Sequence, residues 1–87
     1  MTSKETLTKN LEEMISILEK NNRTHWSSWL KKSLDEINKS DLHGVKRFLD
    51  AFGGMGSLND CYLDAHFNAL ASESYSLAVA LLREHGD

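Results

Sequence analysis

The chain changes character at FGGMGSLND, residues 52–60, where three glycines fall within four positions. Glycine disfavours helix interiors and readily adopts positive φ, so this segment is expected to end a helix. The residues before it have the periodicity of three amphipathic helices, and those after it fit one long helix. The sequence therefore predicts an all-α fold with a single domain over residues 1–87. That domain is a compact bundle of four main helices, with a Gly-rich loop before the last long helix.

Local signals place the ends of these helices. The helices are expected over residues 3–20, 25–38, 41–51 and 65–85. Thr2 and Glu5 have the spacing of a capping box, in which each side chain bonds the backbone N–H of the other residue. Thr24 and Ser40 are residue types that accept hydrogen bonds from the first N–H groups of a helix, so they are the expected N-caps. Gly53 is expected to close the third helix in the left-handed conformation.

Each expected helix carries an apolar face that predicts the core. The faces are Leu7, Leu11, Met14, Ile15 and Leu18; Trp26, Trp29, Leu30, Leu34 and Ile37; Leu42, Val45, Leu49 and Phe52, with Phe48 beside them; and Phe67, Leu70, Ala71, Leu77, Ala78, Leu81 and Leu82. Tyr75 and Val79 would widen the last face. Trp29 and Leu81 are expected to be buried, and Trp26 is either core or an anchor for a partner.

Charge is divided unevenly along the chain, whose net charge is −3. Residues 1–47 carry nine Lys or Arg and seven Asp or Glu, whereas residues 48–87 carry one Arg and six Asp or Glu. An acidic surface repels phosphate backbones and attracts a basic protein surface. The candidate partner-binding residues are therefore Asp50, Met55, Asn59, Asp60, Asp64 and Glu73.

The patterns that would indicate nucleotide or nucleic-acid binding are weak. The glycine loop lacks the Gly-x-x-x-x-Gly-Lys-Ser/Thr pattern of a phosphate-binding loop and does not follow a strand. Lys46 and Arg47 lie in a mixed set of charges on an acidic chain, so a recognition helix for DNA is disfavoured. These observations favour a structural turn and a solvated basic pair.

Catalytic and metal chemistry have no stronger signal. Cys61 could be a nucleophile only with a histidine such as His43 or His66 in reach, and its apolar and acidic neighbours do not favour a thiolate. Asp60, Asp64 and His66 do not form a recognised metal-binding pattern. We therefore expect a protein that is not an enzyme and uses no cofactor and no metal.

The cellular location is predicted from absent signals. The first five residues lack the apolar core of a signal peptide, and the longest apolar run, Leu77 to Leu82, has only six residues. The single cysteine cannot form an internal disulfide. These features predict a cytoplasmic protein that does not engage a membrane.

Trp29-Leu30, Phe48-Leu49 and the segment from Phe52 to Asp60 together resemble the core pattern of a family of small, uncharacterised bacterial helical proteins. The resemblance covers roughly residues 26–82, and its most specific part is Gly-Gly-Met-Gly-Ser-x-Asn-Asp. It implies a compact cytosolic helical domain without established enzymatic activity. In general character the chain is also similar to immunity proteins of bacterial toxin systems, including contact-dependent growth inhibition.

Two functions of different kinds follow from these observations. The first is an immunity-type protein that neutralises a toxin domain, with a nuclease as the expected kind, by occluding its basic active site. The alternative is a non-enzymatic structural or regulatory module, with a homodimer through Trp26 or Tyr75 as one form of it. A small enzyme is the third hypothesis.

Overall fold

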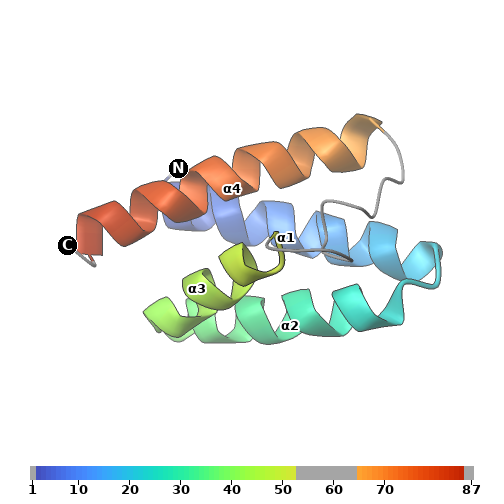
Figure 1. Cartoon of the computed structure of the whole chain (residues 1–87), viewed down its shortest axis with the longest axis horizontal. Helices are drawn as coiled ribbons and strands as arrows, with labels where there is room; N and C mark the ends of the chain where they lie inside the picture. Colours follow the sequence, from blue (N-terminus) through green and yellow to red (C-terminus); the bar gives the residue numbers. More distant parts are fainter. Residues whose placement is uncertain (1, 53–64, 86–87) are drawn as a thin grey trace.

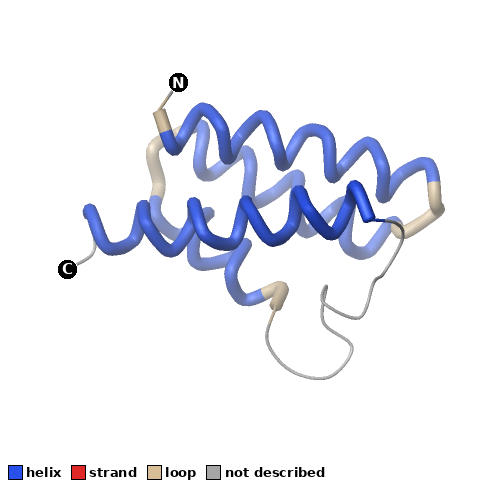
Figure 2. The backbone as a smooth tube through the Cα atoms, turned by 90° about the horizontal axis from the view of Figure 1, so that it is seen from above, coloured by secondary structure: helices blue, strands red, loops and turns tan. Residues whose placement is uncertain are grey.

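The computed structural model describes residues 2–52 and 65–85, which form four α-helices and contain no strand. The helices are α1 (Ser3–Lys20), α2 (Thr24–Asn38), α3 (Leu42–Asp50) and α4 (Ala65–His85). They form a closed ring, because α1 packs on α2 and α4, and α3 packs on the same two helices (Figure 1). The view from above shows α4 running along the bundle beside α1 (Figure 2). The predicted all-α bundle is therefore confirmed.

Helix α1 begins in the predicted capping box. The Glu5 backbone N–H donates to Thr2 Oγ1 at 3.1 Å, and the Thr2 N–H donates to Glu5 Oε1 at 3.1 Å. These bonds satisfy N–H groups that have no partner within the helix. The bond from the Thr2 N–H also lowers the pKa of the Glu5 carboxyl, because it stabilises the charged form of that group.

Helices α1 and α2 both end in a Schellman motif built on a residue other than glycine. Asn22 and Ser40 occupy the left-handed region, with φ of 59° and 62°. In each motif the next residue donates its N–H to the carbonyl oxygen five positions earlier, at 2.9 Å. These bonds satisfy carbonyl groups at the helix ends.

Both predicted internal N-caps are wrong by one residue. Helix α2 includes Thr24, and the capping position belongs to Arg23, whose side chain makes no capping bond. Helix α3 is capped by Asp41, whose carboxylate accepts the His43 N–H at 2.9 Å. Ser40 cannot serve there because it holds the left-handed conformation that ends α2.

Helix α3 lies against α2 at Gly44. A Cβ atom at this position would come within 2.6 Å of the Ser33 carbonyl oxygen, 2.7 Å of Glu36 Cβ and 2.8 Å of the Ile37 nitrogen. Real Cβ atoms do not approach other atoms this closely, so only glycine fits between the two helices. The close contact fixes which side of α3 faces inward.

The rotation of α3 changes its predicted apolar face. Phe48 is fully buried beside Val45 and Ala51, whereas Leu49 and Phe52 are only partly buried. The remaining buried core comes from α1, α2 and α4: Leu7, Leu11, Met14, Ile15, Leu18, Leu30, Ile37, Phe67, Leu70, Ala78 and Leu81. The prediction for α1 is confirmed in full, and that for Leu81 is confirmed as well.

Helix α4 presents small residues to the interior. Ser74 and Ala78 are completely buried, and the Ser74 hydroxyl lies 3.8 Å from Met14 Sδ on α1. Small side chains at these positions let the two helices pack closely. Tyr75 is 44% exposed, so the prediction that it widens the buried face of α4 is wrong.

The Gly-rich loop falls outside the described residues, and so does the predicted cap at Gly53. No helix in the described ranges combines the length and apolarity that a membrane crossing requires.

Candidate functional site

An aromatic cluster lies on the outside of the bundle near the start of α2. The His25 and Trp26 ring centroids are 4.6 Å apart, and those of Trp26 and Trp29 are 5.6 Å apart, both in edge-to-face geometry. His25 is exposed, and both tryptophans are only partly buried. The prediction of a buried Trp29 is therefore wrong in part, since this side chain packs on the core but is only partly buried. The cluster leaves part of its aromatic surface accessible to solvent.

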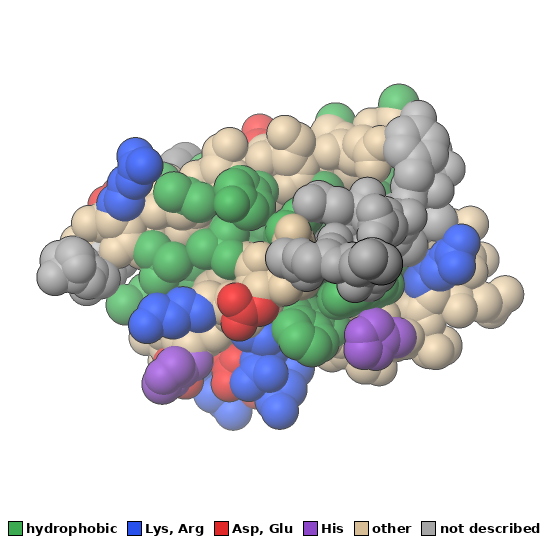
Figure 3. Space-filling model, viewed as in Figure 1, with side chains coloured by type: hydrophobic (Ala, Val, Ile, Leu, Met, Phe, Trp, Pro, Cys, Tyr) green, Lys and Arg blue, Asp and Glu red, His purple; other side chains and the backbone are tan. Residues whose placement is uncertain are grey.

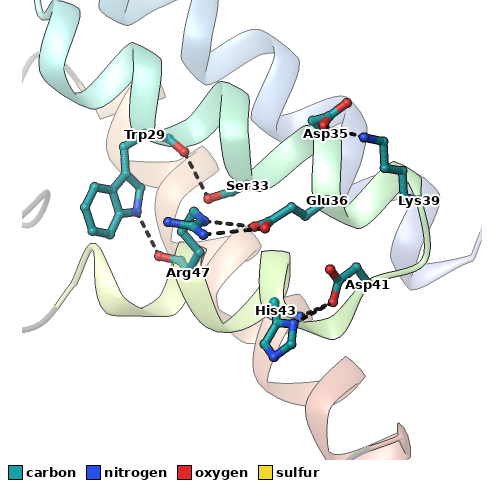
Figure 4. A network of polar contacts seen from close by, with 8 residues as sticks. All are labelled: Trp29, Ser33, Asp35, Glu36, Lys39, Asp41, His43 and Arg47. Atoms are coloured by element: carbon teal, nitrogen blue, oxygen red, sulfur yellow. Dashed lines mark hydrogen bonds and ion pairs between the residues drawn. The ribbon is translucent and has the colours of Figure 1, made fainter.

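Trp29 also connects α2 to α3. Its indole Nε1–H donates to the Arg47 carbonyl oxygen at 2.8 Å, and its own carbonyl accepts the Ser33 hydroxyl at 3.1 Å (Figure 4). The indole can bond α3 only because Gly44 brings that helix close to α2. The ring is thereby held in one orientation at the surface.

An ion pair lies beside the tryptophan. Arg47 Nε donates to Glu36 Oε1 at 2.8 Å, and a second guanidinium nitrogen lies 3.4 Å from Oε2 (Figure 4). The hydrogen bond to Arg47 lowers the pKa of the Glu36 carboxyl, and the same bond raises the pKa of Arg47. The prediction that Lys46 and Arg47 form a solvated pair is wrong for Arg47, which is committed to α2.

These groups surround a shallow hollow between α2 and α3. It is lined by Trp29, Glu36, His43, Lys46, Arg47 and Asp50. Lys46 and Asp50 are exposed, and within the described residues neither makes a hydrogen bond or ion pair. We call the aromatic cluster together with this hollow the α2–α3 face. Exposed charges of both signs beside an oriented tryptophan suit recognition of another protein more than chemistry on a substrate.

The structure separates the two predicted site residues that it describes. Asp50 lines the hollow between α2 and α3. Glu73 lies where α4 meets α1, and its Oε1 accepts a hydrogen bond from Asn10 Nδ2 at 2.7 Å. Because the helices form a ring, these two junctions lie on opposite sides of the bundle. The other predicted site residues, Met55, Asn59, Asp60 and Asp64, lie outside the described residues.

Two features of the α2–α3 face were missed in the sequence. In the sequence, Gly44 is only a residue type that disfavours a helix interior. The reason for a glycine there lies in the α2 backbone, which leaves no room for a Cβ atom. The pairing of Arg47 with Glu36 spans 11 positions and crosses a turn, so no helical spacing predicts it.

His66 lies against the Glu13 carboxylate on the other side of the bundle. Among the described residues, no group of three or more His, Cys, Asp or Glu could hold a metal ion.

A family model described as a domain of unknown function, DUF6966, matches residues 19–71, which is more than half of the chain. The chain belongs to the DUF6966 family. The matched region contains α2 and α3, and therefore the whole α2–α3 face, but it leaves out most of α1 and most of α4. No curated protein and no solved structure matches the chain.

Proposed function

We propose that this DUF6966 protein is a non-enzymatic binding protein of the immunity type. Its partner would be a bacterial toxin domain with a basic active site, such as a nuclease, which the bound chain occludes. The observation that supports this most is the pair of partly buried tryptophans on the α2–α3 face, which adjoin a hollow that Asp50 lines. Tryptophan is enriched among residues that dominate binding energy at protein interfaces.

Trp26 is the better anchor of the two. The Trp29 indole N–H is already bonded to α3, so this side chain supports the fold as well as the surface. The Trp26 ring packs edge-on against His25 and Trp29, and no hydrogen bond joins its indole to a described residue. A cation of the partner can approach such a ring face, an attraction worth about 0.5–2 kcal/mol according to desolvation.

Asp50 supplies the charge that a basic partner would meet. Its carboxylate is exposed and unpaired among the described residues, so it can accept a hydrogen bond from an arginine or lysine. A nuclease active site is basic because it must hold phosphates. Asp50 would take the position of such a phosphate, while Trp26 supplies the apolar contact.

The test is binding of the full chain to the toxin domain encoded beside its own gene, by a kinetic assay at two salt concentrations. Trp26→Ala should raise the dissociation rate at least tenfold, because a central aromatic anchor typically contributes 2 kcal/mol or more. Asp50→Lys should slow association and weaken its dependence on salt. When each variant is co-expressed with the toxin domain, a variant that has lost binding should no longer protect the cells from the toxin.

Glu12→Lys is the matched control for Asp50→Lys. Glu12 is exposed on α1, makes no hydrogen bond or ion pair to a described residue, and undergoes the same change of charge. Equal effects of the two reversals would indicate long-range attraction alone and would contradict docking at the α2–α3 face. If the neighbouring gene encodes no toxin, or if the purified chain turns over a substrate alone, the immunity function fails.

Glu73→Lys distinguishes two ways of docking. A strong effect at Glu73 with little at Asp50 would place the partner on the side where α1 meets α4. Asp60 and Asp64 remain predicted contacts, and their reversal to Lys belongs in the same series.

A second function is favoured by one observation on the adjoining side of the bundle. Among the described residues, Tyr75 is the one large hydrophobic residue that is exposed. Its ring packs edge-on against that of Phe52, with the ring centroids 5.2 Å apart. A homodimeric regulatory module using this surface is the alternative. Sedimentation analysis of wild type and Tyr75→Ser would detect it as a dimer that dissociates in the variant.

A further inference from the structure

A second hollow lies at the end of the bundle where α1 begins and α4 ends. It has a volume of about 420 Å³, which is within the range of roughly 300–1,000 Å³ found for small-molecule sites. All four helices or their adjoining turns contribute to its lining. Figure 3 shows hydrophobic side chains gathered on this part of the surface, between α3 and the last turns of α4.

The walls of this end hollow are apolar. Ile37, Val45 and Leu81 line it and are at most 8% exposed, so they border the hollow while belonging to the core. Leu42 is partly buried and stands at the side. An aliphatic chain entering here would exchange water for contact with carbon atoms, which is favourable in proportion to the area covered.

One cationic group, the Lys4 ammonium, lies at the mouth of the end hollow. Lys4 Nζ donates to the Ser40 hydroxyl at 3.0 Å, joining the first turn of α1 to the turn between α2 and α3. An ammonium group has three N–H donors, so two remain for a ligand. The other charge on the rim is the Asp41 carboxylate, which is turned toward α3 and engaged by the backbone N–H and Nδ1 of His43 (Figure 4). The donors open to a ligand therefore favour an anion.

From this arrangement we infer that the end hollow binds a medium-chain aliphatic carboxylate, such as the anion of a short fatty acid. The chain lies along Ile37, Val45 and Leu81, and the carboxylate accepts hydrogen bonds from the Lys4 ammonium. Because the site lies at the end of the bundle and shares no lining residue with the α2–α3 face, it is independent of the proposed toxin binding.

The experiment is a titration of the full ¹⁵N-labelled chain with octanoate, below the concentration at which it forms micelles, followed by amide NMR shifts. Octanoate should shift the amide signals of residues lining the end hollow and leave those of Trp26 and Trp29 on the α2–α3 face unmoved. Lys4→Met keeps an unbranched side chain of similar length but removes the charge. It should weaken octanoate binding roughly tenfold, the loss expected for one charge-assisted hydrogen bond, and leave 1-octanol binding unchanged.

Lys9→Met is the control, because Lys9 is exposed on α1 and does not line the hollow. Leu42→Trp tests the cavity itself, since a larger ring on this partly exposed side chain should fill the hollow and abolish binding of both ligands. The inference is overturned by the absence of localised shifts, by equal effects of the two Lys→Met changes, or by 1-octanol binding as tightly as octanoate. Should Leu42→Trp not fold, the Lys4 and Lys9 pair still decides the question.

Discussion

At residue 44 a single hydrogen atom takes the place of a side chain, and this sets the distance between α2 and α3. Gly44→Ala should lower the free energy of unfolding by about 1–3 kcal/mol, because the new methyl group meets backbone atoms of α2 that cannot move aside. In an ordinary exposed helical position the same change stabilises by up to about 1 kcal/mol. Urea unfolding measures the difference.

The control for this change is Lys46→Ala in the same helix, whose side chain is exposed. It should alter the free energy of unfolding by no more than about 0.5 kcal/mol. A more stable Gly44→Ala variant would show that the two helices lie further apart than the structure places them.

Ser40 is the other residue whose backbone conformation has a measurable cost. A side chain with φ of 62° is disfavoured, so Ser40→Gly should stabilise the protein by about 0.5–1 kcal/mol. Asn22→Gly should give less, because asparagine tolerates the left-handed region well. Thermal unfolding of both variants compares them, and a destabilised Ser40→Gly would contradict the Schellman motif after α2.

At the scale of the helices, the Glu36–Arg47 pair makes the α2–α3 contact sensitive to acid. The folded-state pKa of Glu36 lies below its ordinary value of 4.5, because its charged form accepts the Arg47 bond. Its contribution to stability is therefore fully present above that value and disappears as the pH falls through the lower, folded-state pKa. Glu36→Gln should flatten the pH dependence of unfolding in this acid range.

Urea unfolding from pH 2 to pH 7 checks this expectation. Glu12→Gln on the exposed face of α1 is the matched control and should retain the acid dependence of the wild type. An unchanged profile for Glu36→Gln would mean that the pair adds nothing to the junction of α2 and α3.

Helix positions could be predicted because they depend on local periodicity. The predicted ranges 3–20 and 65–85 agree with α1 and α4, the start of α2 differs by one residue, and α3 is one residue shorter at each end. What could not be predicted depends on contacts between helices. The inward rotation of α3 follows from Gly44 against the α2 backbone, and the partly buried position of Trp29 follows from its bond to Arg47.

The arrangement of the candidate site residues also depends on contacts between helices. Charge along the sequence grouped Asp50 with Glu73, but the ring of helices places them on opposite sides. Neither periodicity nor composition reports which helices become neighbours.

At the scale of the whole molecule, the region that matches the DUF6966 family model is smaller than the four-helix bundle. A fragment of residues 19–71 lacks Leu7, Leu11 and Met14 of α1 and Leu81 of α4, all of which are core residues. Without them α2 and α3 lose most of their packing partners, so we expect the fragment to bury too little apolar surface to fold by itself. Circular dichroism should show a largely unfolded fragment and a helical full chain.

Dispersed amide NMR signals from the fragment would contradict this expectation. They would mean that α2 and α3 form a stable unit without their neighbours. The full chain measured under the same conditions is the reference.

The ring arrangement also allows the four helices to be connected in a different order by circular permutation. The start of α1 and the end of α4 lie at the same end of the bundle, where Lys4 and Leu81 border one hollow (Figure 1). A short linker could therefore join them, and the chain could be opened instead at the turn around Asn22. In the natural chain α1 and α4 are the two contacting helices that lie furthest apart in sequence. In such a circular permutant they would be consecutive and would form a helical hairpin. Loop closure would then cost less at that junction and more between α1 and α2, so α1 should pack on α4 earlier in folding and on α2 later than in the natural chain.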